Sequence, residues 1–213
     1  MALKDLRRLS NLIFVLILIM AGCSPFGAGT QQSTRFYVLS SLHGEPDSIQ
    51  PLAKLSDIGI GVGPIRMPMY LDRSDIVTRG SQNKVEIAEF AQWAGPLPEN
   101  FIRVVAENLS VLLATDKIAV FPYPRSYFVD YNVTIYVTRF DGSPGDKAHL
   151  RARWAILDSK RRDSFYEKHT IVTHPTENET TEALIAAKSR TVSDLSREIA
   201  KAIIEVSRKY PPK

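Results

Sequence analysis

The chain has 213 residues, of which 44% are hydrophobic and 23% are charged, a composition typical of a globular protein. It carries 27 basic and 23 acidic residues, and this small net charge of +4, without any run of five basic residues, argues against a nucleic-acid-binding protein. The single cysteine, Cys23, excludes an intramolecular disulfide framework and a metal site built from several thiolates.

The amino-terminal segment predicts a secretory signal. Lys4, Arg7 and Arg8 precede an uncharged apolar run at residues 12–20. A membrane-spanning helix needs about 20 apolar residues, which is more than this run contains. A short basic stretch followed by a short apolar stretch is instead typical of a signal peptide. We therefore expect residues 1–22 to be removed, which lowers the net charge to about +2.

The sequence Met-Ala-Gly-Cys at residues 20–23 resembles the lipobox of bacterial lipoproteins. In these proteins a diacylglycerol is attached to the cysteine, and the chain is cut directly before it. The resemblance implies that Cys23 carries the acyl chains, palmitate among them, and becomes the first residue of the mature protein. The alternative is an ordinary secreted protein with a stray thiol, which in an oxidising compartment would have no partner.

Residues 24–34, SPFGAGTQQST, are typical of a flexible linker because they are rich in Gly, Ser, Thr and Gln. Eleven such residues have an r.m.s. reach of about 17–20 Å. We therefore expect residues 23–34 to tether a folded domain, residues 35–213, close to a membrane. Ser24 follows the cysteine where an Asp would favour the inner membrane. By resemblance to sorted lipoproteins, this implies the outer membrane.

Short β-rich segments open the domain. Residues 35–40, RFYVLS, predict a first strand. Residues 75–79 and 84–90 predict two more strands, and the polar residues between them predict a turn. We expect these two strands to form a hairpin.

Residues 57–65, DIGIGVGPI, alternate between isoleucine or valine and glycine. A phosphate-binding loop is excluded, because the glycine spacing is wrong and Pro64 follows where a helix should begin. Glycines on one face of a strand instead allow another backbone or a bulky ring to approach closely. We therefore predict a strand with one closely covered face.

Two amphipathic helices are predicted, the first from Pro98 to about Thr115 and the second over residues 180–208. Pro98 is favoured at the first helical position. In the first helix, apolar residues recur at helical spacing: Leu97, Phe101, Val104, Val105, Leu109, Leu112 and Leu113. The same spacing holds in the second for Leu184, Val192, Leu195, Ile199, Ala202, Ile203 and Val206.

Three alternating segments, at residues 128–140, 148–157 and 164–173, predict long strands joined by short polar turns. Such strands form an antiparallel meander with one wet face. A shorter strand is predicted from residue 117. We therefore expect an α+β fold: a single domain with a mainly antiparallel or mixed β-sheet and two long amphipathic helices packed on it.

No catalytic or metal-binding pattern is recognisable. The sequence contains no G-x-S-x-G, H-E-x-x-H or Walker motif. Its histidines are not spaced as ligands on a helix: His43, His149, His169 and His174. We predict a protein that is not an enzyme and has no cofactor and no metal.

Two segments are candidates for partner binding. RMPMYLDR gathers Met67, Met69 and Tyr70 between prolines and charges, and FAQWAGPLP contains Trp93. Methionine and aromatic residues are enriched in binding surfaces. Either segment could equally be a packed loop, and for Trp93 the two interpretations have equal weight.

The order of several short motifs resembles the ABC-type transport auxiliary lipoproteins, including their PqiC/YmbA-like branch. The motifs are FYVL, IGIGVGPI, PMYLDR, IVTR, AQWAGPL and ARWAI. The resemblance implies a mixed α+β domain and a non-enzymatic role in lipid transport between the inner and outer membranes, which contributes to membrane integrity. It further implies an MCE-domain protein as partner. Whether the system is Pqi-like or Mla-like, and whether the chain forms a homo-oligomer, stays open.

The leading hypothesis is an outer-membrane-anchored periplasmic lipoprotein that acts as an adaptor for an MCE-type lipid transport system. The alternative is a periplasmic lipoprotein that itself binds a lipid or another apolar ligand. An apolar cavity would favour the alternative, whereas a solid core with an exposed apolar patch would favour the adaptor. A lipid-modifying hydrolase has little support, because no pair of nucleophile and base can be named.

Overall fold

The structure is a computed structural model that describes residues 33–42, 49–124, 126–160 and 162–212. The predicted signal peptide, Cys23, nearly all of the tether and His43 lie outside the described residues. Residues from Thr34 onward form one compact unit with two sheets and two long helices, which confirms the α+β prediction.

The larger sheet has five strands in the order β5-β2-β6-β7-β8. Its strands are β2 (Ile60–Arg66), β5 (Ile118–Val120), β6 (Tyr131–Gly142), β7 (Lys147–Asp158) and β8 (Ser164–Pro175). The last three form the predicted antiparallel meander, whereas β2 pairs in parallel with both β5 and β6.

The smaller sheet has three strands in the order β1-β4-β3. Strands β3 (Asp75–Ser81) and β4 (Lys84–Trp93) form the predicted hairpin, and β1 (Arg35–Tyr37) lies parallel to β4. The 3-10 turn η2 (Met69–Leu71) connects β2 to β3 and therefore passes from one sheet to the other.

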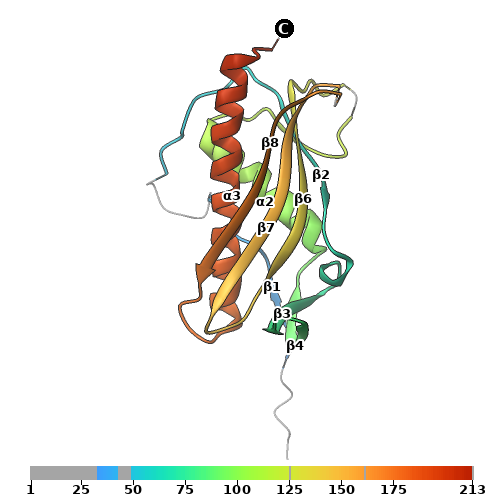
Figure 1. Cartoon of the computed structure of the whole chain (residues 1–213), viewed down its shortest axis with the longest axis vertical. Helices are drawn as coiled ribbons and strands as arrows, with labels where there is room; N and C mark the ends of the chain where they lie inside the picture. The colour runs from blue at the N-terminus through green and yellow to red at the C-terminus, as the bar shows by residue number, and fades with distance from the viewer. Residues whose placement is uncertain (1–32, 43–48, 125, 161, 213) are drawn as a thin grey trace, which may run out of the picture. The chain divides into compact units, whose positions relative to one another are not determined.

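Two helices, α2 (Leu97–Leu113) and α3 (Thr181–Lys209), cover one face of the larger sheet (Figure 1). Helix α2 begins at Leu97, one residue before the predicted start, so Pro98 is its second residue. The Thr180 side chain accepts a hydrogen bond from the first turn of α3. The 29 residues of α3 span about 43 Å at 1.5 Å per residue. No helix among the described residues is both long and apolar enough to cross a membrane.

The core lies between the two helices and the larger sheet. The side chains that alternate toward the helices are buried: Val133, Ile135 and Val137 on β6, and Leu150, Ala152, Trp154 and Ile156 on β7. Arg151 and Arg153, which alternate with them, are exposed on the other face. The predicted register of these strands is therefore confirmed, and the polar residues of the meander lie on an open sheet face.

Gly61 of β2 and Gly59, directly before β2, have the close neighbours that the sequence predicted. A Cβ atom on Gly61 would lie 2.7 Å from the Tyr123 hydroxyl oxygen, and one on Gly59 would overlap the Phe128 carbonyl. The segment between β5 and β6 therefore crosses this part of β2 at a distance that only glycine allows.

Candidate functional site

A fully buried carboxylate, Asp141 of β6, joins the two sheets. Its Oδ2 lies 2.6 Å from Nη2 of Arg79 on β3, and its Oδ1 lies 2.7 Å from Nε of Arg139 on β6. Burial alone would raise the pKa of Asp141, but hydrogen bonds from the two guanidinium groups outweigh burial and hold the pKa below its ordinary value. Because β3 belongs to the smaller sheet, this ion pair fixes that sheet to the larger one.

A buried lysine of α3 lies beside this carboxylate. Lys188 is 1% exposed, and its Nζ donates long hydrogen bonds of 3.4 and 3.5 Å to the carbonyl oxygens of Phe140 and Val77. The same ammonium lies 5.0 Å from the centre of the Phe140 ring and 5.6 Å from that of Trp93. Burial lowers the pKa of Lys188 to about 8, and Asp141 opposes this shift only in part.

These contacts place Trp93, one of the sequence candidates, in the core. Its side chain is 3% exposed and packs against the Lys188 ammonium. Trp93 therefore stabilises the junction of the two sheets with α3, and it presents no surface to a partner in this structure.

The other sequence candidates differ in exposure: Met67 and Tyr70 contact the core, whereas Met69 lies in solvent. Met67 and Tyr70 are partly buried and pack against the core, and burial raises the pKa of Tyr70. Leu71 is 2% exposed and its amide donates to the Pro68 carbonyl at 2.9 Å, which closes the turn. Met69 is 91% exposed. The turn η2 therefore holds Met69 in solvent between residues that are fixed to the fold.

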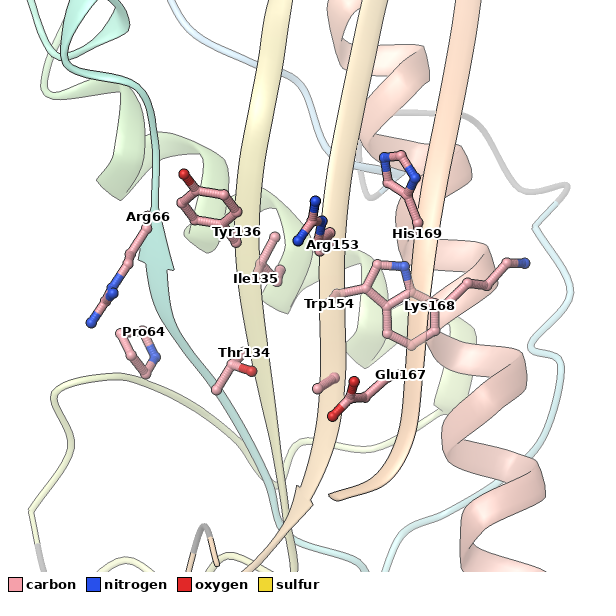
Figure 2. A pocket seen from close by; sticks show the side chains of 11 residues that line it. Pro64, Arg66, Thr134, Ile135, Tyr136, Arg153, Trp154, Glu167, Lys168 and His169 are labelled. Carbon is pink, nitrogen blue, oxygen red and sulfur yellow. The ribbon is translucent and has the colours of Figure 1, made fainter. Parts of the chain in front are cut away.

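A second feature lies on the open face of the larger sheet. Arg66 pairs in register with Tyr136, Tyr136 with Arg153, and Arg153 with His169. These four residues therefore form one row across β2, β6, β7 and β8, which we call the cross-strand row. Figure 2 shows their side chains on the four neighbouring strands. The cross-strand row lines a groove of about 640 Å³ that is open to solvent.

The groove carries an excess of positive charge. Among the described residues, Arg66 and Arg153 form no ion pair. Lys168 also borders the groove, but its ammonium pairs with Glu198 of α3 at 3.0 Å. Within the part of the chain that the structure describes, Glu167 is the one carboxylate that lines the groove. The arrangement is suited to binding anionic groups.

The sequence predicted a meander with one wet face, on which Arg151 and Arg153 lie, but it did not predict the cross-strand row. The available signal was the alternation within β7, where basic residues occupy successive outward positions. The register with β2 carried no sequence signal, because β2 is joined to β6 through a parallel pairing with an irregularity between Val62 and Ile65.

The described residues offer no arrangement suited to metal chemistry. In the ranges from 33 to 212 that the structure covers, no group of three or more His, Cys, Asp or Glu side chains could hold a metal ion. His174 lies 2.8 Å from Asp194 of α3, so its side chain joins β8 to the helix.

Comparison with known proteins gives a family match. A family model described as the ABC-type transport auxiliary lipoprotein component matches residues 37–200. No curated protein matches the sequence significantly.

Two solved structures resemble the whole domain. One is the crystal structure of an uncharacterized protein, with a TM-score of 0.65, 17% sequence identity, and coverage of 80% of this chain and 99% of that chain. The other is a protein from Xanthomonas campestris of family DUF330, with a TM-score of 0.63, 16% identity, and coverage of 82% and 98%. At these identities the likeness shows the fold alone.

Proposed function

Since the chain belongs to the family of ABC-type transport auxiliary lipoprotein components, we propose that it is a periplasmic docking component of an MCE-type intermembrane lipid transport system. It is held in the outer membrane by acyl chains on Cys23 and contributes to membrane integrity without catalysing a reaction. In this proposal residues 1–22 form the signal peptide, residues 23–34 the tether, and residues 35–213 the docking domain. An MCE-domain protein is the partner.

The observation that carries this proposal is the display of Met69. A methionine that is 91% exposed contributes nothing to the core, and η2 is fixed by the buried Leu71. Single exposed apolar residues are common. A flexible thioether on a rigid turn is nevertheless suited to enter an apolar pocket of a partner, since methionine repacks readily against varied surfaces.

The packing of the domain also favours docking over storage of a ligand. A protein that holds a lipid needs an enclosed apolar cavity. Between the helices and the larger sheet, large buried side chains fill the space: Phe101, Leu109, Leu112, Tyr131 and Phe140. The groove of the open face is open to solvent and not enclosed, and arginine, lysine, glutamate and histidine side chains line it together with apolar ones.

The test is Met69→Asp in the full-length protein. We expect the melting temperature to change by less than about 2 °C, because the side chain is in solvent, and co-purification of the MCE-domain protein to be lost. Leu52→Asp is the matched control, because Leu52 is also an exposed apolar residue and lies beside the end of α2. A stable Met69→Asp protein that still captures the partner would exclude η2 from the interface. If the unmodified protein captures no MCE-domain protein, the proposed function is wrong.

A further inference from the structure

The geometry of the cross-strand row sets the spacing of its charged groups. Neighbouring strands lie about 4.8 Å apart. Arg66 and Arg153 stand two strands apart, so their backbones are about 10 Å from each other, with the half-exposed Tyr136 between them. His169 extends the row by one more strand. The backbones of two arginines and a histidine are therefore held in one row at intervals set by the spacing between strands.

The charged side chains on the two faces of β8 differ in their ion pairing. On the face toward α3, Lys168 pairs with Glu198 and His174 with Asp194. On the open face, His169 lies beside Arg153, and no ion pair is formed there by either side chain among the described residues. Lys168 and His174, on the face of β8 toward α3, therefore help to hold the sheet to the helix. Arg153 and His169, on the open face, contribute no ion pair of this kind among the described residues.

The next outward-facing residues along β7 and β8 are also exposed, and one of them is an arginine. Arg151 of β7 pairs in register with Ile171 of β8, which is 62% exposed. Arg151 also forms no ion pair within the described chain. The open face thus combines exposed arginine, tyrosine and isoleucine side chains, and arginine and aromatic residues are enriched at the centres of protein interfaces.

A simpler explanation is that exposed charges keep an open sheet face soluble and discourage edge-to-edge association. That explanation requires only scattered charges of either sign. It does not account for the alignment of Arg66, Arg153 and His169 in one row, or for the groove that they line. A guanidinium group binds a carboxylate through two parallel hydrogen bonds, so a row of this kind is suited to acidic side chains.

We infer that the groove of the open face binds an acidic segment of a partner protein, with its carboxylates paired to Arg66 and Arg153 and its apolar side chains against Tyr136 in the groove and against Ile171, which lies outside the groove on the same sheet face. The groove has a volume of about 640 Å³ and is open to solvent, so an extended chain segment can enter it. The inference rests on the proposed function only for the identity of the protein that supplies the segment.

The test uses the mature protein in detergent and a fluorescein-labelled ten-residue peptide of alternating glutamate and valine, with a lysine–valine peptide for comparison. We expect the protein to bind only the glutamate peptide, and to bind it more weakly as salt is raised. Arg66→Glu and Arg153→Glu should each weaken binding at least tenfold. Lys201→Glu, an equal change of charge on the exposed side of α3, should leave it unchanged.

Several outcomes would overturn the inference. These are equal binding of both peptides, absence of binding, or a loss with Lys201→Glu as large as that with Arg153→Glu. Binding of phosphatidylglycerol vesicles that depends on Arg153, without peptide binding, would assign the face to lipid instead. Melting curves of the variants within about 2 °C of the unmodified protein exclude misfolding as the cause.

Co-purification of the MCE-domain protein shows whether a negative result contradicts this inference or the proposed function. If Arg153→Glu captures the MCE-domain protein as well as the unmodified protein does, the open face is not used and the docking function stands. If no MCE-domain protein is captured at all while the peptide results are as expected, the face still binds acidic segments and the proposed function fails.

Discussion

Arg79 of β3 and Asp141 of β6 form an ion pair of 2.6 Å that joins the smaller sheet to the larger one. The carboxylate is fully buried, and the guanidinium is about one-fifth exposed. The segment that displays Met69 runs between these two sheets, so its position depends on this pair.

The first prediction is that Asp141→Ala lowers the free energy of unfolding by about 3–5 kcal/mol, because it leaves the charges of Arg79 and Arg139 without their shared partner. Urea unfolding followed by circular dichroism measures this loss. Glu107→Ala is the control, since it removes an exposed pair with Arg103 on α2 that is worth about 0.3–0.5 kcal/mol. Similar small losses from both variants would show that the Asp141 pair does not hold the sheets together.

The second prediction concerns Lys188 and alkaline pH. Its pKa is about 8 in the folded state and 10.5 as the ordinary value. Between these values the unfolded chain binds the proton and the folded chain does not, so stability rises as pH increases. We expect this lysine to add about 2 kcal/mol to the free energy of unfolding between pH 7 and pH 10.

Lys188→Met isolates this effect, because the variant keeps the length of the side chain and removes the titrating group. The difference in stability between Lys188→Met and the unmodified protein should therefore shift by the same amount over that pH range, measured by urea unfolding at each pH. A difference that is constant with pH would show that the Lys188 ammonium is not desolvated by the fold.

The third prediction concerns the covered glycines of β2. Gly61→Ala should destabilise the domain by about 1–3 kcal/mol, since its Cβ would lie 2.7 Å from the Tyr123 hydroxyl oxygen and 2.8 Å from Oδ1 of Asn132. Gly95→Ala is the matched control, because no atom lies within 4 Å of the added Cβ. Thermal melts compare the two, and equal melting temperatures would contradict the close approach at Gly61.

The fourth prediction concerns the anchor. Cys23→Ser should prevent lipid addition and leave an uncleaved or mislocalised precursor, because the proposed acyl chains would then have no attachment point. Membrane fractionation and intact-mass measurement check this expectation. Mature-sized protein that still fractionates with the outer membrane would show that residues 20–23 are not a lipobox.

Much of the fold was predictable because its longest elements have strict periodicity. The two-residue alternation of β6 and β7 predicted which side chains are buried, and the helical spacing predicted α2 and α3 to within a few residues. The division into two sheets was not predicted. It depends on β1 and β2 pairing in parallel with strands far along the chain, and such pairings leave no local pattern.

Within the candidate site, the exposure of Met69 agrees with the prediction that its loop could bind a partner. The buried charges of Lys188 and Asp141 were not predicted. Lys188 is four residues from both Leu184 and Val192, so its spacing places it on the apolar stripe of α3. Lysine is rarely fully buried, so the residue type gave no reason to place Lys188 in the core. Asp141 precedes a glycine and a turn, where exposed aspartate is common. This position gave no sign that its side chain is buried.

The short strand β1 has a mechanical consequence for a protein held at one end. It contains three residues at the edge of its sheet, and Tyr37 and Arg35 fasten it to Glu182 of α3 at 3.0 and 3.4 Å. In the proposed arrangement, tension between the lipid anchor and a docked partner would enter the domain at residue 34 and would therefore load β1 before the twelve-residue strands of the meander. Detachment of β1 would lengthen the connection by about 10 Å and leave the open sheet face intact, so the domain would yield to a pull without releasing a segment bound there.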